Sequence, residues 1–321
     1  MTHDQIADAL WRSIQRGIHD PAELHGAVRS IDDAYSVQLG LLERYERAGE
    51  RQAGWKVGLT AKAIQEQLGY HEPVFGFLLE SGHRPSGIVF DFDALNRPGI
   101  ENEICITLGE SLAGPGVTFE QARRAVSDVA PALEVIEKRH VARPDMELTM
   151  ADNGQQKAFV TGTAVPLGAL DVAMMTVEVA VNGVAKEHAL GAEVLGEGPI
   201  TSVAWLANKL SKFGRRLEAG SRVMSGSFTR QYDLTRGDAV TAKFTSLGSV
   251  TATFRWPSPC RGSLRRRLIP RYCGRAGPIS WDRRHRLKRG LTLFGRLPVD
   301  CSPWPYDSSS TSDVRRHSEF D

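Results

Sequence analysis

Hydrophobic residues recur every three or four positions in two segments near the amino terminus. The first segment predicts a helix from about Ile6 to Ile14, which ends before Pro21. The second predicts a helix that starts at Ser30 and continues to about Tyr45. Ser30 suits the start because its hydroxyl can accept a hydrogen bond from a free backbone N–H of the first turn. The chain is therefore expected to begin with two amphipathic helices.

From residue 53 onward, short apolar runs bounded by turn residues predict mostly strands. Helices are expected to interrupt them at Thr60–Leu68, Thr118–Val129 and Thr201–Phe213. The pair Asn182-Gly183 is a strong signal for a tight hairpin turn. The expected strands are Ala53–Leu59, Phe75–Leu79, Ile88–Phe92, Ile100–Leu108, Ala132–Ile136, Phe159–Val165, Met175–Val181, Val184–Ala189, Val240–Phe244 and Val250–Phe254.

The periodic pattern stops near Pro257, and the composition changes there as well. Residues 256–321 carry 14 Lys and Arg against 6 Asp and Glu, a net charge of +8, whereas residues 1–255 carry a net charge of −6. We expect residues 256–321 to be a disordered or adventitious tail, such as a reading frame carried past its natural stop would produce. The alternative is a non-enzymatic arm that binds nucleic acid or another acidic surface, although no nucleic-acid-binding motif accompanies the charge.

Three features of the composition indicate a cytoplasmic protein. No apolar run approaches the roughly 18 residues that a membrane span requires. The segment Met1–Gln5 lacks the basic and then apolar pattern of a signal peptide. Only Cys105 among the four cysteines lies before residue 256, which fits a reducing compartment without structural disulfides.

Two glutamates, Glu101 and Glu103, lie within the apolar run Ile100–Ile106, which has the character of a buried strand. Side chains alternate along a strand, so both carboxylates should point to one face, ~7 Å apart. Such a pair is costly to bury unless a cation lies between its members. A third acid, Glu134, occupies a similar apolar run. Three carboxylates without cysteine or histidine ligands predict a site for Mg²⁺ or Mn²⁺, and the alternative is that they face solvent on amphipathic strands.

The segment Gly54–Thr60 places Lys56 in an apolar strand that leads into a helix start at Thr60. A lysine in such a strand is costly to bury unless it meets a carboxylate or an anionic substrate, and a helix start offers free N–H groups to anions. Beside a cation held by the acids, these groups could bind a small 2-oxo acid. The metal would then chelate its 1-carboxylate and 2-oxo oxygens and stabilise an enolate. A lysine solvated at a sheet edge is the alternative.

Four motifs, in their order along the chain, resemble one enzyme group. They are Gly54–Thr60, Glu101-Asn102-Glu103, Pro131–Ile136 and Ala151–Gly154, and the likeness extends to about Phe254. The sequence is similar to the 2-oxopent-4-enoate hydratase and 4-oxalocrotonate decarboxylase group of the fumarylacetoacetate-hydrolase-like superfamily. The resemblance implies an α+β fold, in which a mixed β-roll forms the catalytic domain at 53–255. An N-terminal helical segment at 1–52 would pack on this core, and the irregular tail at 256–321 has no counterpart in the group.

Site residues follow from the same resemblance, motif by motif. The loop after Ala151 is where the family places substrate-binding groups. The implied set is Glu101, Glu103 and Glu134 as metal ligands, Lys56 as the active-site lysine, and Thr60, Asn153 and Gln155 as substrate-binding residues.

The segment His71–Leu78 distinguishes the two activities of the group. Hydratases typically carry an aspartate after its proline, where this chain has Val74, and the Pro-Val-Phe-Gly-Phe form is similar to that of the decarboxylases. Hydration needs a group that moves protons. Loss of CO₂ needs an electron sink and an apolar wall around the departing carboxylate, which Val74 and Phe75 could supply. Glu72 or His71 could replace the missing aspartate, so a hydratase with Glu72 as a catalytic residue is the alternative.

We therefore expect a divalent-metal-dependent lyase of aromatic meta-cleavage pathways. It would decarboxylate 2-oxohex-3-enedioate (4-oxalocrotonate) to 2-hydroxypenta-2,4-dienoate. The alternatives are a 2-hydroxypenta-2,4-dienoate hydratase and, more remotely, a C–C hydrolase of acylpyruvates. The implied partners are a short 2-oxo or 2-hydroxy dienoic acid and further copies of the chain, and an association with a sister enzyme of the pathway is left open. Neither a membrane nor a nucleic acid is expected as a partner.

Truncation after Phe254 tests the expectation for the tail. Its arginine-rich, proline-punctuated composition offers little apolar area to offset ordering, which costs roughly 1–2 kcal/mol of backbone entropy per residue. The shortened protein should keep its metal affinity and its turnover, measured side by side with the full chain. Unfolding or lost turnover would show that the tail is an integral element.

Overall fold

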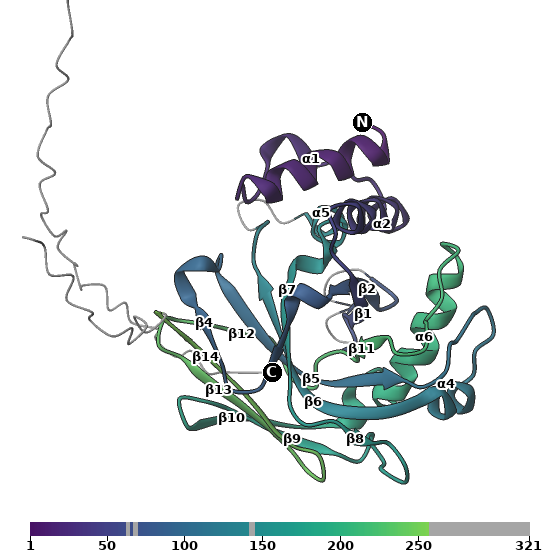
Figure 1. The fold of residues 1–321 in the computed structure, drawn as a ribbon, viewed down its shortest axis with the longest axis vertical. Coiled ribbons are helices and arrows are strands. Elements are labelled where there is room, and N and C mark those ends of the chain that lie inside the picture. Colours follow the sequence, from purple (N-terminus) through teal and green to yellow (C-terminus); the bar gives the residue numbers. More distant parts are fainter. Residues whose placement is uncertain (62–64, 67–69, 141–144, 257–321) are drawn as a thin grey trace, which may run out of the picture. The chain divides into compact units, whose positions relative to one another are not determined.

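A computed structural model describes residues 1–61, 65, 66, 70–140 and 145–256. The described residues all belong to one compact unit. The expected tail lies outside the described residues, as does most of the helix expected at Thr60–Leu68. Figure 1 shows helices on one side of a curved arrangement of strands, so the described part of the chain has the expected α+β character.

Two helices open the chain, as the hydrophobic periodicity predicted. Helix α1 (His3–Gln15) is capped by the Thr2 hydroxyl, and helix α2 (Ile31–Arg47) by the Ser30 hydroxyl. Their apolar faces pack against each other and against the short helix α5 (Met146–Ala151). Helix α5 was not predicted, because six residues are too few to show a helical period.

The larger sheet has nine strands and carries the acidic motifs. Its order is β2-β1-β11-β5-β6-β7-β3, with β12 paired to β5 and β8 paired to β6. The central strands β5 and β6 are buried on both faces, which explains why both read as continuous apolar runs. The strands are β1 (Gln52–Gly58), β2 (Val74–Leu79), β3 (His83–Pro85), β5 (Pro98–Leu108), β6 (Val126–Glu137), β7 (Gln156–Thr161), β8 (Val165–Pro166), β11 (Arg222–Met224) and β12 (Tyr232–Asp233).

A second sheet of five strands packs on the first and has the order β10-β9-β13-β14-β4. Strands β13 and β14 contact β6, and their apolar residues join the main core. The predicted hairpin turn at Asn182-Gly183 connects β9 to β10, with both residues at positive φ. The strands are β4 (Ile88–Asp91), β9 (Thr176–Val181), β10 (Val184–Leu190), β13 (Ala239–Phe244) and β14 (Gly248–Arg255).

Helices α4 (Phe119–Ala125) and α6 (Pro199–Ser211) contact each other (Figure 1). Helix α4 corrects the predicted helix Thr118–Val129, because Val126 already belongs to β6. Val126 pairs with Leu108 of β5, so ladder hydrogen bonds and a β-branched side chain favour the strand from that point. The predicted strand Phe159–Val165 is likewise divided between β7 and β8.

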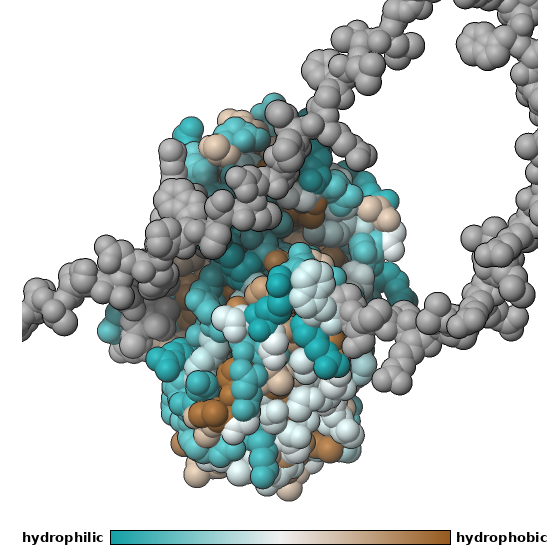
Figure 2. Space-filling view, turned by 90° about the vertical axis from the view of Figure 1, so that its left-hand side faces the viewer, coloured by the Kyte–Doolittle hydropathy of each residue, from teal (hydrophilic) through white to brown (hydrophobic). Residues whose placement is uncertain are grey.

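The surface shows no single dominant feature in the described part of the chain. The face drawn in Figure 2 is mainly hydrophilic, with hydrophobic residues scattered over it. The large exposed hydrophobic side chains come from separate elements and include Phe119, Met174 and Val184. Among the described residues, no helix combines the length and the apolar character needed to cross a bilayer.

Candidate metal centre and active site

The three predicted acids meet on one face of the central strand pair. Glu101 of β5 lies directly opposite Glu134 of β6, and Glu103 follows two positions later on the same face of β5. One carboxylate oxygen from each lies within 4.8 Å of the others. Carboxylate oxygens that bind one Mg²⁺ at about 2.0–2.1 Å stand a few ångströms apart, so this spacing suits a single cation.

Two of the three acids are fully buried, Glu101 is half-buried, and their charges are not fully compensated. Glu103 and Glu134 are 0% exposed. Glu103 accepts a hydrogen bond from the Gly226 amide at 2.8 Å through Oε2. Its Oε1 and both oxygens of Glu134 have no hydrogen-bond partner in the described residues. Buried carboxylates are normally paired or bound to a metal, so the orphaned oxygens fit a divalent cation held between the three side chains.

Burial and mutual repulsion change the acidity of this cluster. Burial, followed by the Glu134 charge, raises the pKa of Glu101 to about 7 despite the opposing effect of Lys56. Burial and the charges of Glu134 and Glu101 likewise raise the pKa of Glu103 well above its usual range. Without a cation, the cluster therefore retains protons at pH values where ordinary glutamates have lost them.

These pKa shifts predict a pH-dependent metal effect on stability. A glutamate whose pKa rises from 4.5 to about 7 on folding destabilises the metal-free protein progressively across that pH interval. A bound divalent ion compensates the ionised carboxylates, so the Tm increase caused by saturating Mg²⁺ should grow from pH 4.5 to at least about 7. Thermal unfolding with Mg²⁺ and with EDTA measures this, and a Tm difference that stays constant over the interval would contradict it.

Lys56 lies beside the acids because β1 curves next to β11, which pairs in turn with β5. Its Nζ is 3.5 Å from Glu134 Oε1, and its side chain is 7% exposed. Burial disfavours the ammonium form, but the charges of Glu134, Glu101 and Glu103 outweigh burial and raise the pKa of Lys56. The lysine is therefore protonated and supplies a fixed positive charge beside the predicted metal ligands.

A tight loop packs over the Lys56 side chain. Asn153, Gly154 and Gln155 (η4) all have left-handed backbone angles, with φ of 56°, 55° and 62°. A Cβ atom on Gly154 would lie 2.9 Å from Lys56 Nζ, so only glycine permits this approach. The missing side chain of Gly76 on β2 also leaves room for Lys56, because a Cβ atom there would lie 3.1 Å from Lys56 Cε.

The side chains of Asn153 and Gln155, the predicted substrate-binding residues of this loop, form hydrogen bonds that fix the loop to its neighbours. The Asn153 side chain accepts a hydrogen bond from the Phe77 amide at 2.7 Å and donates one to the Phe77 carbonyl at 2.9 Å. Gln155 accepts from the Arg139 amide and donates to the Thr149 hydroxyl. Both amide groups therefore help to hold the loop in place, and their binding of substrate stays a prediction.

Thr60 is buried next to the cluster of three glutamates. A Cβ on Gly226 would lie 2.3 Å from Thr60 Cγ2, and the Gly226 amide is the donor to Glu103. Gly226 was not among the predicted residues. The sequence feature that could have pointed to Gly226 is the tripeptide Ser225-Gly226-Ser227 after an apolar stretch. Such a glycine can mark a close approach of two backbones, but the approaching segment cannot be identified until the neighbouring strand is known.

Val74 and Phe75 lie on opposite faces of β2. Val74 of β2 pairs with Gly58 of β1. A Cβ atom placed on Gly58 would lie 3.4 Å from Val74 Cγ2 and 3.6 Å from Lys56 Nζ, so both side chains border the same space above Gly58. Val74 therefore lies on the Lys56 side, where it also packs in the hydrophobic cluster formed by α1, α2 and α5. Phe75 instead stacks on Tyr35, with ring centroids 4.1 Å apart, in the hydrophobic core. Because neighbouring strand residues alternate, Phe75 points away from the Lys56 side, and a direct role for it in substrate binding stays an untested prediction.

Glu72 does not turn toward the acidic cluster. Its carboxylate lies 2.5 Å from the buried Lys209 ammonium of α6. That ammonium lies 5.2 Å from the centroid of the Tyr35 ring, which belongs to the core on the other side of β2. Glu101, Glu103 and Glu134 are the acids whose charges act on Lys56. The structure therefore does not support Glu72 as a replacement for the aspartate of the hydratases.

An ion-pair network that the sequence did not reveal anchors the loop over Lys56. Arg139 donates to Asp152 Oδ2 at 2.6 Å and to the Asp152 carbonyl at 3.0 Å. His140 lies 2.9 Å from the same carboxylate oxygen. Burial opposes the charge on Asp152, but the Arg139 charge and the His140 hydrogen bond lower its pKa below the ordinary value. His140 is thus a buried partner of Asp152 rather than a surface group.

The fold and this acidic cluster together define a class of protein. Residues 63–255 match the family described as "Fumarylacetoacetate (FAA) hydrolase C-terminal". The chain belongs to this family, as the resemblance of its motifs predicted.

Relatives of two activities resemble the chain to a similar degree. A 4-oxalocrotonate decarboxylase of Pseudomonas putida is 36% identical over 78% of this chain and 94% of its own length. A 2-hydroxypent-2,4-dienoate hydratase of the same species is 37% identical over 66% of this chain and 96% of its own. The solved structure of a 4-oxalocrotonate decarboxylase from Pseudomonas putida G7, complexed with magnesium and adipate, has a TM-score of 0.74 at 34% identity, over 79% and 98% of the two chains.

Proposed function

We propose that this protein is a divalent-metal-dependent decarboxylase that converts 2-oxohex-3-enedioate to 2-hydroxypenta-2,4-dienoate and CO₂. The observation that carries the choice is Val74, a buried apolar side chain on the same sheet face as Lys56. The comparisons include both decarboxylases and hydratases at 36% and 37% identity, so overall similarity does not separate them. The side chains on the Lys56 face of β2 therefore carry the proposal.

The three glutamates are proposed to hold one Mg²⁺ or Mn²⁺ ion. Their orphaned oxygens and 4.8 Å spacing support this, as does the magnesium in the related decarboxylase structure. A bound ion would supply the electron sink for the 2-oxo group of the substrate. Lys56 would offset the negative charge that the oxygen at C2 gains as the C5–C6 bond breaks, since its ammonium lies beside these acids.

The departing carboxylate needs a different environment from the oxygen at C2. Electrons leave the C5–C6 bond, form the C4–C5 double bond and move through C3 to the oxygen at C2, and a proton then completes 2-hydroxypenta-2,4-dienoate. Val74 and the loop over Lys56 would exclude water from the carboxylate end, which favours release of neutral CO₂. The adipate in the related structure is also a six-carbon dicarboxylate, which supports a dicarboxylic substrate.

The second candidate is 2-hydroxypenta-2,4-dienoate hydration, because a hydratase of this activity is 37% identical to the chain. Hydration needs a group that carries protons between water and a substrate carbon. Val74 cannot do so, and Glu72 is engaged by Lys209. Neither of these two side chains therefore supports hydration, which favours the decarboxylase.

Replacing Val74 with aspartate tests the choice directly. The new carboxylate would repel the distal carboxylate of the substrate, so CO₂ release should fall by roughly 10²-fold, and water addition should become measurable. Val74→Asn is the matched control, because it adds polarity without charge. CO₂ and hydrated product are assayed separately with the dienedioate and the dienoate. Unchanged decarboxylation in Val74→Asp, or efficient hydration by the unmodified protein, would favour the hydratase.

The setting of the enzyme follows from this reaction. We propose a cytoplasmic enzyme of aromatic meta-cleavage that acts as a homo-oligomer. An association with the enzyme that supplies its unsaturated diacid would limit loss of this reactive compound. We also propose that residues 53–255 contain the whole catalytic apparatus, because every residue of the described centre lies between Lys56 and Gly226.

A further inference from the structure

A cavity separate from the metal centre lies between the N-terminal helices and the sheet. Its volume is about 610 Å³, within the range of small-molecule sites, and it is lined by α1, α2, β2, β3, β7 and the turn after β4. Phe77 lines the cavity and follows Gly76, the residue that pairs with Lys56. Ala158 also lines the cavity and precedes Phe159, the residue that pairs with Glu134. Because side chains alternate, the cavity lies on the sheet face opposite to the acids.

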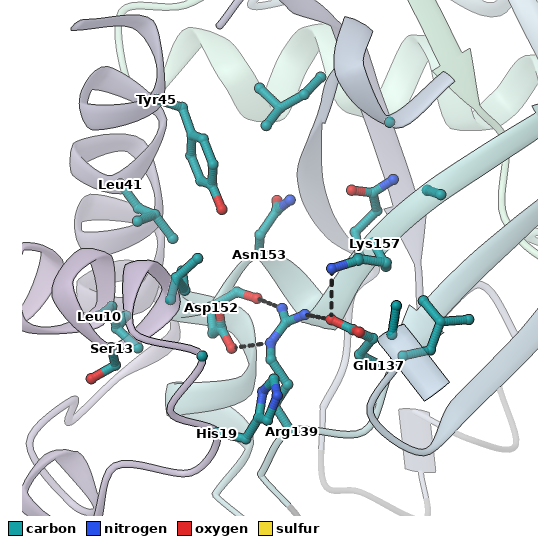
Figure 3. Close-up of a pocket in the computed structure, with 18 of the residues that line it drawn as sticks. Leu10, Ser13, His19, Leu41, Tyr45, Glu137, Arg139, Asp152, Asn153 and Lys157 are labelled. Carbon is teal, nitrogen blue, oxygen red and sulfur yellow. Dashed lines mark hydrogen bonds and ion pairs between the residues drawn. The ribbon is translucent and has the colours of Figure 1, made fainter. Parts of the chain in front are cut away.

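The cavity has an apolar wall and a polar floor whose acids are already paired. Leu10, Leu41 and Leu79 contribute to the wall. On the floor, Glu137 Oε2 forms ion pairs with the Arg139 guanidinium at 3.3 Å and with Lys157 Nζ at 3.4 Å (Figure 3). Its other oxygen accepts from the Asn96 amide. Asp152 is held by Arg139 and His140.

Two hydrogen-bond donors of the cavity have no protein partner among the described residues. Gln156 Nε2 is buried without a partner in the part of the chain that the structure describes. The Tyr45 hydroxyl points into the cavity toward Asp152 and Asn153, and none of the hydrogen bonds of the described residues engages it (Figure 3). Burial and the nearby Asp152 charge raise the pKa of Tyr45 to about 12, so this hydroxyl stays protonated. A ligand that satisfies both donors must bring acceptor oxygens.

We propose that this cavity binds a small aromatic carboxylic acid and that its occupancy is transmitted to Lys56. The ring would lie against the apolar wall, and the carboxylate would accept from Tyr45 and Gln156 close to the Lys157 ammonium. An aromatic acid fits because its carboxylate accepts hydrogen bonds from the donors on the floor, while its ring needs no hydrogen-bond partners against the apolar wall.

The route to Lys56 is short. Asp152 and Asn153 line the cavity, and the next residue, Gly154, packs on the Lys56 side chain from the other side of the loop. The left-handed backbone of residues 153–155 leaves little freedom for one side to move alone. A ligand that shifts Asp152 should therefore shift Lys56 Nζ and lower kcat, while the substrate still binds.

Binding of 4-fluorobenzoate, followed by ¹⁹F NMR on the full-length protein, tests the site. Tyr45→Phe keeps the ring contacts with Trp11 and Phe77 but removes the hydroxyl, and should weaken binding about tenfold. Gln156→Met should have a similar effect. Tyr232→Phe is the matched control, since its hydroxyl bonds Glu187 and it does not line the cavity. Binding should persist after EDTA treatment, whatever reaction the metal centre performs.

Kinetics test the connection. We expect 4-fluorobenzoate to lower kcat with KM unchanged, and Tyr45→Phe to remove this effect while its own turnover stays normal. Competitive inhibition that survives Tyr45→Phe, or binding abolished by EDTA, would place the acid in the metal centre and overturn the proposal. Binding that depends on Tyr45 but leaves kcat unchanged would retain the site and overturn its connection to Lys56.

Discussion

Glu134→Gln should abolish metal binding and lower turnover by at least 10³-fold. Glu134 is fully buried opposite Glu101, and both of its oxygens lack hydrogen-bond partners in the described residues. The change removes one charge from a site whose ligands act as a unit, so most of the activity should disappear with it. Calorimetric titration with Mg²⁺ and steady-state kinetics of the same preparation measure the two losses.

A matched control separates this effect from a general loss of acidity. Glu178→Gln alters an exposed glutamate that pairs with His188 on β9 and β10, far along the chain from the cluster. It should leave both metal affinity and turnover unchanged. Because Glu134→Gln also relieves repulsion among buried acids, the metal-free variant should be at least as stable as the metal-free parent. Retained Mg²⁺ affinity in Glu134→Gln would show that the three acids do not form the metal site.

Lys56→Met should lower kcat by about 10²–10⁴-fold while it preserves or strengthens metal binding. The ammonium lies 3.5 Å from Glu134 and competes with a cation for the same carboxylates. Removal of the lysine therefore takes away both the charge that assists the reaction and a competitor for the ligands. Opposite changes in kcat and in Mg²⁺ affinity are the signature to look for, and they distinguish a catalytic lysine from a structural one.

Lys209→Met is the matched control for this experiment, because Lys209 is a second buried lysine paired with a glutamate. It should change stability more than turnover. If Lys209→Met were to eliminate turnover and Lys56→Met were not, the Glu72–Lys209 pair would be the catalytic element, and the site described around Lys56 would be wrong.

The acidic cluster was predictable because strand alternation is a local rule. The spacing of Glu101 and Glu103 fixes their common face, and the apolar run around Glu134 indicates a second buried strand. By the same rule Phe75, which follows Val74 directly on β2, points to the opposite face of the sheet. The fold class could be inferred from the order of helical and strand patterns together with the family motifs.

The remaining parts of the site depend on contacts between distant segments. Strand β11 is three residues long, too short for an alternating pattern, yet it pairs with both β1 and β5 and leads to the Gly226 amide. The Arg139–Asp152 pair and the left-handed turn at Asn153 arise from packing after β6 and α5 are placed. Sequence periodicity carries no information on such pairings, which only the assembled sheet determines.

The placement of ligands on directly paired strands has a consequence for how the protein is made. Glu101 and Glu134 face each other only in one alignment of β5 and β6, and a slip by one residue would turn one of them to the opposite face. A cation that requires all three carboxylates would thus be captured by the correctly aligned chain and rejected by its misaligned forms. Supply of the ion during synthesis should act as proofreading of the nascent sheet, so that metal scarcity lowers the yield of folded enzyme before it limits the rate of any one molecule.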